Sequence, residues 1–216
     1  MTVKNYKHLL ALFLFGFGTL VFYLWFINSS HFPGFLVWSQ GNIIFYYFVL
    51  VLLKVIGIIW PPIPGGLLTL GSIPVLGWPL AYSADFFGSI VGSTVAYFLA
   101  RKYGINFMKK IFDENTIEKL TKIRIKPHRE IESLFLFRFF GGTIIEIICY
   151  GAGLLKVRFR NYLIATILSH IAIGIPAFYL TRNILAGRGI LINLSLVTIM
   201  LILFFNLRHR YFEYSS

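Results

Sequence analysis

The sequence predicts an all-α protein that crosses a membrane several times. Hydrophobic residues make up 57% of its 216 residues and charged residues only 13%, a balance outside that of soluble globular domains. Apolar runs of about 20 residues recur along the chain, long enough to cross a bilayer as helices. Residues 101–132 contain nine lysines and arginines, whereas residues 29–42 contain none. We expect about four transmembrane helices, two opposed re-entrant hairpins and cytoplasmic-surface amphipathic helices, all in a single membrane domain over residues 1–216.

The first predicted transmembrane helix covers residues 9–28 and follows Lys4 and Lys7. An uncleaved signal-anchor would have the same pattern. Because short cytoplasmic loops are rich in lysine and arginine, residues 29–42 should lie outside and residues 101–132 inside. This orientation places both termini in the cytoplasm. The small size of the chain favours a prokaryotic inner membrane.

The second apolar region, residues 43–82, is interrupted by the stretch PPIPGG. A complete crossing here would place residues 101–132 outside, against the expected orientation. A hairpin that enters and leaves by the outer face removes this conflict. Proline lacks a backbone donor and glycine tolerates unusual backbone angles, so both suit the tip of a hairpin. The predicted tip consists of Pro61, Pro62, Pro64, Gly65 and Gly66.

The third apolar segment, residues 83–100, has a small residue at every fourth position: Ala84, Gly88, Gly92, Ala96 and Ala100. Such a stripe lets another helix approach closely. We expect it to pack inside the monomer, and a homodimer interface is the alternative. Residues 101–132 then combine apolar and charged positions at helical spacing. They predict one or two amphipathic helices on the inner surface, with a solvated linker as the alternative.

A second hairpin is predicted over residues 133–155, where Gly141 and Gly142 interrupt an apolar run that is flanked by charges. It should enter and leave by the cytoplasmic face, so that its tip approaches the first tip near the middle of the membrane. Two ordinary spans, residues 161–181 and 190–207, follow.

Charged side chains inside a bilayer are costly, so those within apolar segments are candidate functional residues. Four residues qualify: Lys54, Asp85, Arg138 and Glu146. Lys54 either pairs with Glu146 or Asp85 or faces a cavity, and Asp85 is either a helix cap or part of a proton relay. Arg138 either pairs with Glu146 or binds a phosphate or carboxylate through its planar donor groups.

No catalytic signature accompanies these charges. The chain has no G-x-S-x-G, H-E-x-x-H or P-loop motif and no paired aspartates for metal ions. We therefore expect no enzymatic activity, no metal and no cofactor. The net charge of +12 comes mainly from the predicted cytoplasmic segments, which favours contact with anionic lipids over nucleic acid. Cys149 is the single cysteine, and it and His170 are expected to be buried core residues.

Four stretches in order resemble the DedA family, also called the VTT or SNARE-associated Golgi protein family. They are PPIPGGLLTLGSIPVLG, GSIVGSTVAYFLARKYG, FRFFGGTIIEIICYGAG and KVRFRNYLIATIL. The resemblance implies a family-like core of about residues 43–184. It also implies a membrane transporter or a lipid translocase, and bacterial members of the family include recyclers of undecaprenyl phosphate. By position it implies a first tip at Pro61, Pro64 and Gly65, and a second hairpin that contains Arg138, Tyr150 and Gly153. It also implies helix-packing roles in the third segment for Gly88, Gly92, Tyr97, Arg101 and Gly104.

The chain departs from the family pattern at the positions that would carry protons. Members usually have an acidic residue before the first tip, where this chain has Lys54 and Gly57, and often another where it has Gly66. Many also have a proline and an arginine where this chain has Gly141 and Ile144. Glu146 and Asp85 are the acidic residues left for proton coupling.

Three functions follow as hypotheses. The first is movement of an anionic lipid headgroup, such as a polyprenyl phosphate or a phospholipid, between leaflets through a groove between the hairpins. The predicted binding residues are Lys54, Asp85, Arg138, Gly141, Gly142 and Glu146. The second is proton-coupled transport of an ion or small solute. The third is a membrane scaffold that assembles through the small-residue stripe.

Overall fold

The computed structural model describes residues 17–18, 21–22, 24–60, 65–109, 111–112, 114–122, 125, 127–140 and 145–187. This part of the chain is helical and contains no strand, which confirms the predicted all-α class. Its elements are α2 (Phe32–Gly41), α3 (Ile43–Ile59), α4 (Gly65–Gly71), α5 (Ile73–Met108), α6 (Glu114–Lys122), the 3-10 turn η1 (Pro127–Arg129), α7 (Glu130–Phe140), α8 (Ile145–Leu154) and α9 (Phe159–Leu185).

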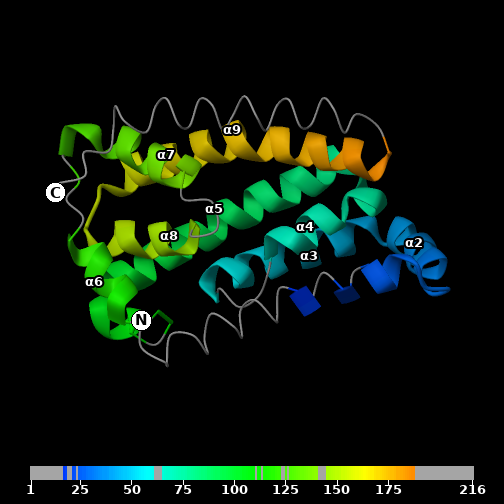
Figure 1. Cartoon of the computed structure of the whole chain (residues 1–216), viewed down its shortest axis with the longest axis horizontal. Coiled ribbons are helices and arrows are strands. Elements are labelled where there is room, and N and C mark those ends of the chain that lie inside the picture. The colour runs from blue at the N-terminus through cyan, green and yellow to red at the C-terminus, as the bar shows by residue number, and fades with distance from the viewer. Residues whose placement is uncertain are drawn as a thin grey trace.

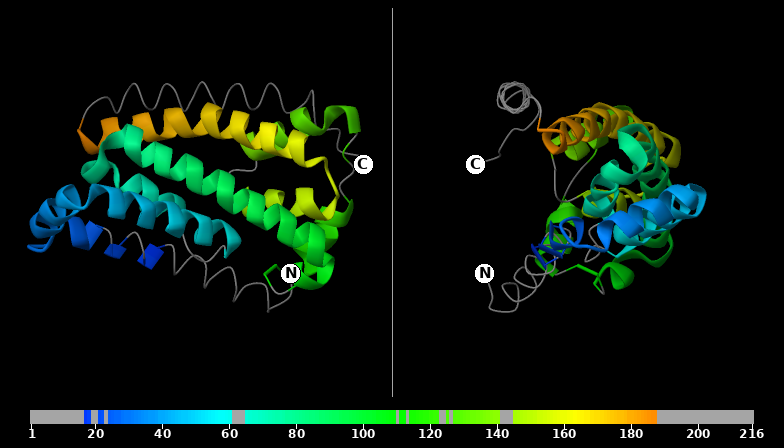
Figure 2. Two further views of the ribbon diagram at one scale, coloured as in Figure 1. Left: turned by 180° about the vertical axis from the view of Figure 1, so that it is seen from behind. Right: turned by 90° about the vertical axis from the view of Figure 1, so that its right-hand side faces the viewer.

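Helix α5 lies at the centre of the arrangement (Figure 1). Helices α3, α4 and α8 pack on one side of it and α9 on the other, with α7 packed against α9 (Figure 2). The two arms of the second predicted hairpin pack mainly against different helices, α7 against α9 and α8 against α5, and they also contact each other. The amphipathic helix α6 lies at one end of α5, where Ile117 and Leu120 are buried in the core.

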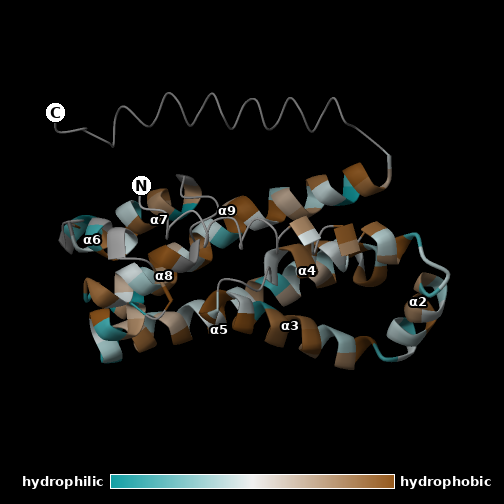
Figure 3. Ribbon diagram, turned by 60° about the horizontal axis from the view of Figure 1, so that its bottom comes forward, coloured by the Kyte–Doolittle hydropathy of each residue, from teal (hydrophilic) through white to brown (hydrophobic). Residues whose placement is uncertain are grey.

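Helices α5 and α9 are long and apolar enough to cross a membrane, and α2 with α3, bent by 103°, forms a third candidate span. The predicted segments 83–100 and 161–181 lie inside α5 and α9. The predicted helix at residues 9–28 is described only in part, and residues 190–207 lie outside the described residues. Large apolar side chains such as Phe48 on α3, Phe87 on α5 and Leu168 on α9 are exposed. Hydrophobic residues are frequent along these three helices (Figure 3).

The helices end and begin near the positions that the proline and glycine residues predicted. Helix α3 ends at Ile59 and α4 begins at Gly65, while α7 ends at Phe140 and α8 begins at Ile145. Pro61, Pro62, Pro64, Gly141 and Gly142 lie outside the described residues. That each pair of helices enters and leaves by the same membrane face stays a prediction.

Two elements differ from the expectation. The return arm of the first predicted hairpin is only the short α4, because Ser72 is already the N-cap of α5, which begins at Ile73 with Pro74 in its first turn. Residues 73–82, expected in the hairpin, therefore belong to α5, which bends at Gly77 (φ 73°) and again at Gly104 (φ 62°). Residues 32–41, expected in a loop, form α2, with Pro33 in its first turn.

Glycines let the neighbouring helices approach α5 closely. A Cβ atom at Gly88 would lie 2.7 Å from Lys54 Cβ, and one at Gly92 would lie 3.1 Å from Val55 Cα, both on α3. On α8, a Cβ at Gly153 would collide with the Tyr97 carbonyl oxygen of α5. The structure thus places the small-residue stripe against helices of the same chain.

The Gly153 contact leads to a stability prediction. Gly153→Ala should lower the thermal unfolding midpoint by roughly 3–10 °C, because backbone atoms of α5 or α8 must move to admit the methyl group. Thermal unfolding of the purified protein in detergent measures this shift.

Gly151→Ala on the same helix is the matched control. Its Cβ would meet the flexible Leu120 side chain, with Cδ2 at 3.0 Å, so the midpoint should fall by much less. Equal losses for the two variants would mean that close packing at Gly153 is not what matters.

Candidate functional site

A buried polar surface runs along the contact between α5 and α9. On α5 the residues Asp85, Ser89 and Ser93 are four apart, so they share one helix face, and each is at most 5% exposed. On α9, Tyr162 and His170 contact this face, and Thr166 and Ser169 are buried polar residues of the same helix. Buried polar groups in a membrane protein need partners, and their arrangement here forms two clusters around the charged residues.

The first cluster surrounds Asp85, which lies inside α5 and is 3% exposed. Lys54 Nζ on α3 lies 2.6 Å from Asp85 Oδ1. The Thr69 hydroxyl of α4 donates to the same oxygen at 2.6 Å. His170 Nε2 on α9 lies 3.0 Å from Asp85 Oδ2, although its N–H has no aligned hydrogen-bond acceptor. Asp85 thus links four helices and is not a helix cap.

The second cluster surrounds Arg138 on α7, which is 4% exposed. Its Nη2 donates to Ser93 Oγ on α5 at 3.2 Å and to Cys149 Sγ on α8 at 2.9 Å. The guanidinium carbon lies 5.8 Å from the centre of the Tyr162 ring, within range of a cation–π interaction. The Tyr162 hydroxyl in turn donates to the Ser93 carbonyl oxygen at 2.9 Å.

The positive charge of Arg138 has no carboxylate partner among the described side chains, and its Nε–H is buried without a hydrogen-bond acceptor. The side chain of Glu146 lies outside the described residues, so the predicted Arg138–Glu146 pair stays a prediction. The arrangement leaves a buried guanidinium with donor capacity to spare. Such a group can bind an anion.

Other predicted site residues hold the helices together. The Tyr97 hydroxyl donates to the Val157 carbonyl oxygen at 2.6 Å, and Arg101 donates to the Tyr97 hydroxyl and to the same carbonyl. The Tyr150 hydroxyl donates to the carbonyl oxygen of Ile59, the last residue of α3. The bonds to the Val157 and Ile59 carbonyl oxygens join segments that are far apart in the sequence.

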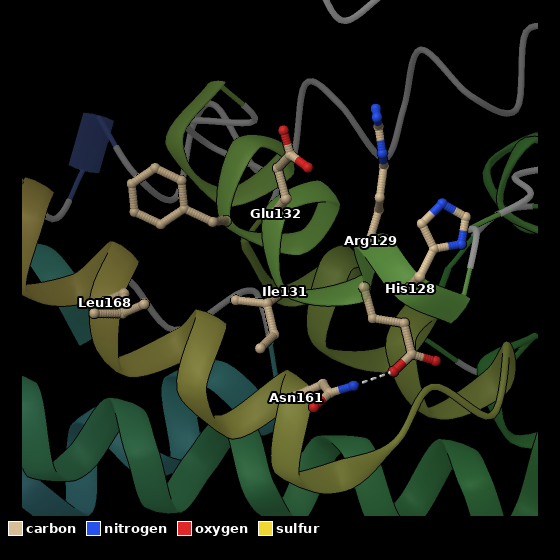
Figure 4. A pocket seen from close by; sticks show the side chains of 8 residues that line it. His128, Arg129, Ile131, Glu132, Asn161 and Leu168 are labelled. Atoms are coloured by element: carbon tan, nitrogen blue, oxygen red, sulfur yellow. Dashed lines mark hydrogen bonds between the residues drawn. The ribbon is translucent and has the colours of Figure 1, made fainter.

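A surface pocket of about 410 Å³ opens between α7 and the first half of α9. Figure 4 shows Arg129 and Glu132 directed away from α9 and the apolar Ile131 directed toward it. Phe135, one helical turn before Arg138, lines the pocket too, and Glu130 accepts a hydrogen bond from Asn161 at 2.7 Å. The pocket is thus lined by both charged and apolar side chains.

The model of the VTT domain family matches residues 49–183, which include both clusters and the pocket. This chain belongs to the VTT domain family. It is therefore an integral membrane protein, in agreement with its apolar helices. A relative of this VTT protein, an uncharacterized protein from Methanocaldococcus jannaschii, is 30% identical over 118 residues, or 52% of this chain and 69% of the relative. No solved structure matches the chain.

Sequence reasoning on this VTT protein found the charges but missed most of their partners. Lys54, Asp85 and Arg138 were visible because they interrupt apolar segments, whereas Thr69, Ser93 and Tyr162 are ordinary in membrane helices. The four-residue spacing of Asp85, Ser89 and Ser93 was the available signal, because it predicts one polar helix face. His170 and Cys149 were expected as core residues, and the structure buries Cys149 and places His170 beside Asp85.

The lack of a described carboxylate partner leads to a prediction for Arg138. Arg138→Gln should leave the thermal unfolding midpoint within about 3 °C of the wild type, because the lost hydrogen bonds are offset by removal of an uncompensated buried charge. Thermal unfolding in detergent without added phosphate measures this.

Arg101→Gln is the control, because it removes charge-assisted bonds to Tyr97 and Val157 and should lower the midpoint by about 3–10 °C. A similar loss for Arg138→Gln would contradict the prediction. If Glu146→Gln gave the same loss, the two residues would form a structural pair.

Proposed function

We propose that this VTT protein transports lipids, moving an anionic headgroup between the two leaflets while the lipid tail remains in the bilayer. The substrate class is a lipid phosphate, either a polyprenyl phosphate or a phospholipid. The headgroup passes between the two predicted hairpins, close to Arg138. The protein acts as a transporter without catalysing a chemical reaction.

The observation that carries this proposal is the buried guanidinium of Arg138. A charge in the membrane interior is retained where it has a function or a partner, and none of the described carboxylates is its partner. The planar guanidinium is suited to phosphate, and its buried Nε–H is available for one more acceptor. A phosphate on this edge would supply both the missing negative charge and the missing acceptor.

The surroundings of Arg138 support a lipid over a small soluble anion. The pocket between α7 and α9 is lined by both apolar and charged side chains and comes within one turn of Arg138 along α7. Large apolar side chains are exposed along α9, among them Leu168 at the pocket and Ile171. An amphiphilic molecule matches this lining, with its headgroup toward the charges and its tail along α9.

The distribution of basic residues supports the proposed setting. We place both termini in the cytoplasm of a prokaryote and the protein in its inner membrane, with α6 and η1 at the cytoplasmic surface. Helix α6 fits this position, because Ile117 and Leu120 are buried while Glu118 is exposed.

The Asp85 cluster favours a second candidate function, proton-coupled transport of an ion or small solute. A buried carboxylate beside a histidine can exchange a proton, and broken helices near the membrane centre often form ion sites in transporters. This function requires a cavity closed to the bilayer and a rate that depends on the proton gradient. Lipid movement requires neither.

The proposal is tested by lipid movement in liposomes. Purified protein is reconstituted with trace labelled undecaprenyl phosphate or phosphatidylglycerol, and the fraction of headgroups accessible from outside is followed over time. Wild type should move at least one of the two lipids well above empty liposomes. Arg138→Gln should reduce the rate by at least tenfold, because it removes the group that replaces water around the phosphate.

Arg182→Gln is the matched control, because Arg182 is exposed in the last turn of α9, and its rate should equal that of the wild type. Folding of each variant is checked by thermal unfolding before reconstitution. No movement of either lipid by folded wild type, or equal rates for Arg138→Gln and wild type, would refute the proposal.

A further inference from the structure

Lys54 lies in a slot that glycines on two neighbouring elements leave open. A Cβ atom at Gly88 of α5 would lie 2.7 Å from Lys54 Cβ and 2.8 Å from Lys54 Cγ. At Gly65 of α4, a Cβ would lie 3.1 Å from Lys54 Cα and 3.3 Å from Lys54 Cδ. Any larger side chain at either position would displace the lysine stem. The fold therefore leads this ammonium group inward, where the side chain is only 14% exposed.

The Lys54 ammonium group lies at the inner end of this slot, beside a group of oxygen atoms. Asp85 Oδ1 lies 2.6 Å from Lys54 Nζ and 2.6 Å from the Thr69 hydroxyl. The same hydroxyl lies 3.1 Å and 3.0 Å from the carbonyl oxygens of Gly65 and Gly66. A carboxylate, a hydroxyl and nearby carbonyls are oxygen ligands of the kind that hold a proton or a small hard cation. Here the Lys54 ammonium occupies the place beside the carboxylate.

The charges near Asp85 already balance. Among the described residues, the titratable groups around it are Lys54 on α3, Tyr82 on its own helix and His170 on α9. With a neutral imidazole, one ammonium and one carboxylate sum to zero. His170 stacks on Phe86 with ring centres 5.6 Å apart, and its Nε2 lies beside Asp85 Oδ2 at 3.0 Å. No further cation is required to keep this carboxylate buried.

We propose that the Lys54 ammonium is a tethered counter-cation, occupying beside Asp85 the place that a transported proton or metal cation would otherwise take, so that lipid movement is not driven by a cation gradient. This inference rests on the proposed function, which identifies a lipid as the transported molecule. It adds a statement about the energy source of the transport. A tethered cation stays with the protein throughout the cycle. Asp85 therefore does not need to take up a proton or a metal cation from one side of the membrane in each cycle.

The first test removes the ammonium and needs no lipid assay. Thermal unfolding of wild type, Lys54→Met, Asp85→Asn and Lys54→Met/Asp85→Asn is measured between pH 5.5 and 8.5, in sodium or choline chloride. Lys54→Met should unfold at least about 6 °C below wild type at pH 8.5, because Asp85 is then buried without its cation. At least half of this loss should be recovered at pH 5.5 or in sodium, when a proton or a metal ion replaces the ammonium.

The rescuing proton binds the Asp85 carboxylate or the His170 imidazole, and in either case it supplies the missing positive charge. The double variant Lys54→Met/Asp85→Asn has neither charge, so its loss at pH 8.5 relative to wild type should be smaller than that of Lys54→Met. Its midpoint should also change with pH and with sodium no more than the wild-type midpoint does. If Lys54→Met cannot be purified, recovery of folded protein in the double variant gives the same answer.

The second test measures lipid movement by wild type with and without an imposed pH or sodium gradient, and with a protonophore. The rates should agree within twofold. A wild-type rate that depends on either gradient would overturn the inference. A Lys54→Met midpoint that neither acid nor sodium restores, or a double variant as unstable as Lys54→Met, would overturn it too.

The two tests separate this inference from the proposed function. If folded wild type moves neither lipid, the proposed function fails, while the thermal measurements still decide whether Lys54 is a replaceable counter-cation. If lipids move but the rate follows a gradient, the proposed function stands and the tethered cation is refuted.

Discussion

The close approach of α3 and α8 to α5 is the constraint on which the other contacts depend. Where Gly88, Gly92 and Gly153 stand, a single methyl group would collide with the neighbouring helix. Because the backbones lie so close, short bonds can join elements that are distant in sequence. Lys54 reaches Asp85, and the Tyr150 hydroxyl reaches the end of α3. In a bilayer the hydrophobic effect does not drive helices together, so packing of this kind supplies most of the association.

The same helix α5 carries one residue of each polar cluster, yet the two clusters differ in charge. Asp85 and Ser93 are eight residues apart, about 12 Å along the helix. Around Asp85 the charges cancel, whereas around Arg138 the described side chains leave one positive charge. A buried ion pair costs the fold less than an uncompensated buried charge, and such a charge is kept only for a purpose. This difference is the basis of the two proposals, a ligand for Arg138 and a structural cation at Lys54.

Much of the fold could be predicted because proline, glycine and long apolar runs act locally. The stretch PPIPGG predicted the break after α3, and the apolar runs predicted the segments that lie in α5 and α9. The start of α5 at Ile73 could not be predicted, because hydropathy is continuous across Ser72 and the turn there depends on backbone bonds. Lys54 and Asp85 could be found from the sequence because they are charged residues within apolar segments. Their pairing could not be derived from the sequence, because Glu146 was an equal candidate until the helices were placed.

Cys149 gives the Arg138 cluster an internal reporter. It is the single cysteine in 216 residues, it is fully buried, and its sulfur lies 2.9 Å from Arg138 Nη2. A thiol in this position is shielded from reagents while α5, α7 and α8 stay together. Its rate of alkylation by a small uncharged reagent therefore measures how often the helices separate around Arg138. The native protein thus carries, without any added label, a probe for opening of the Arg138 cluster.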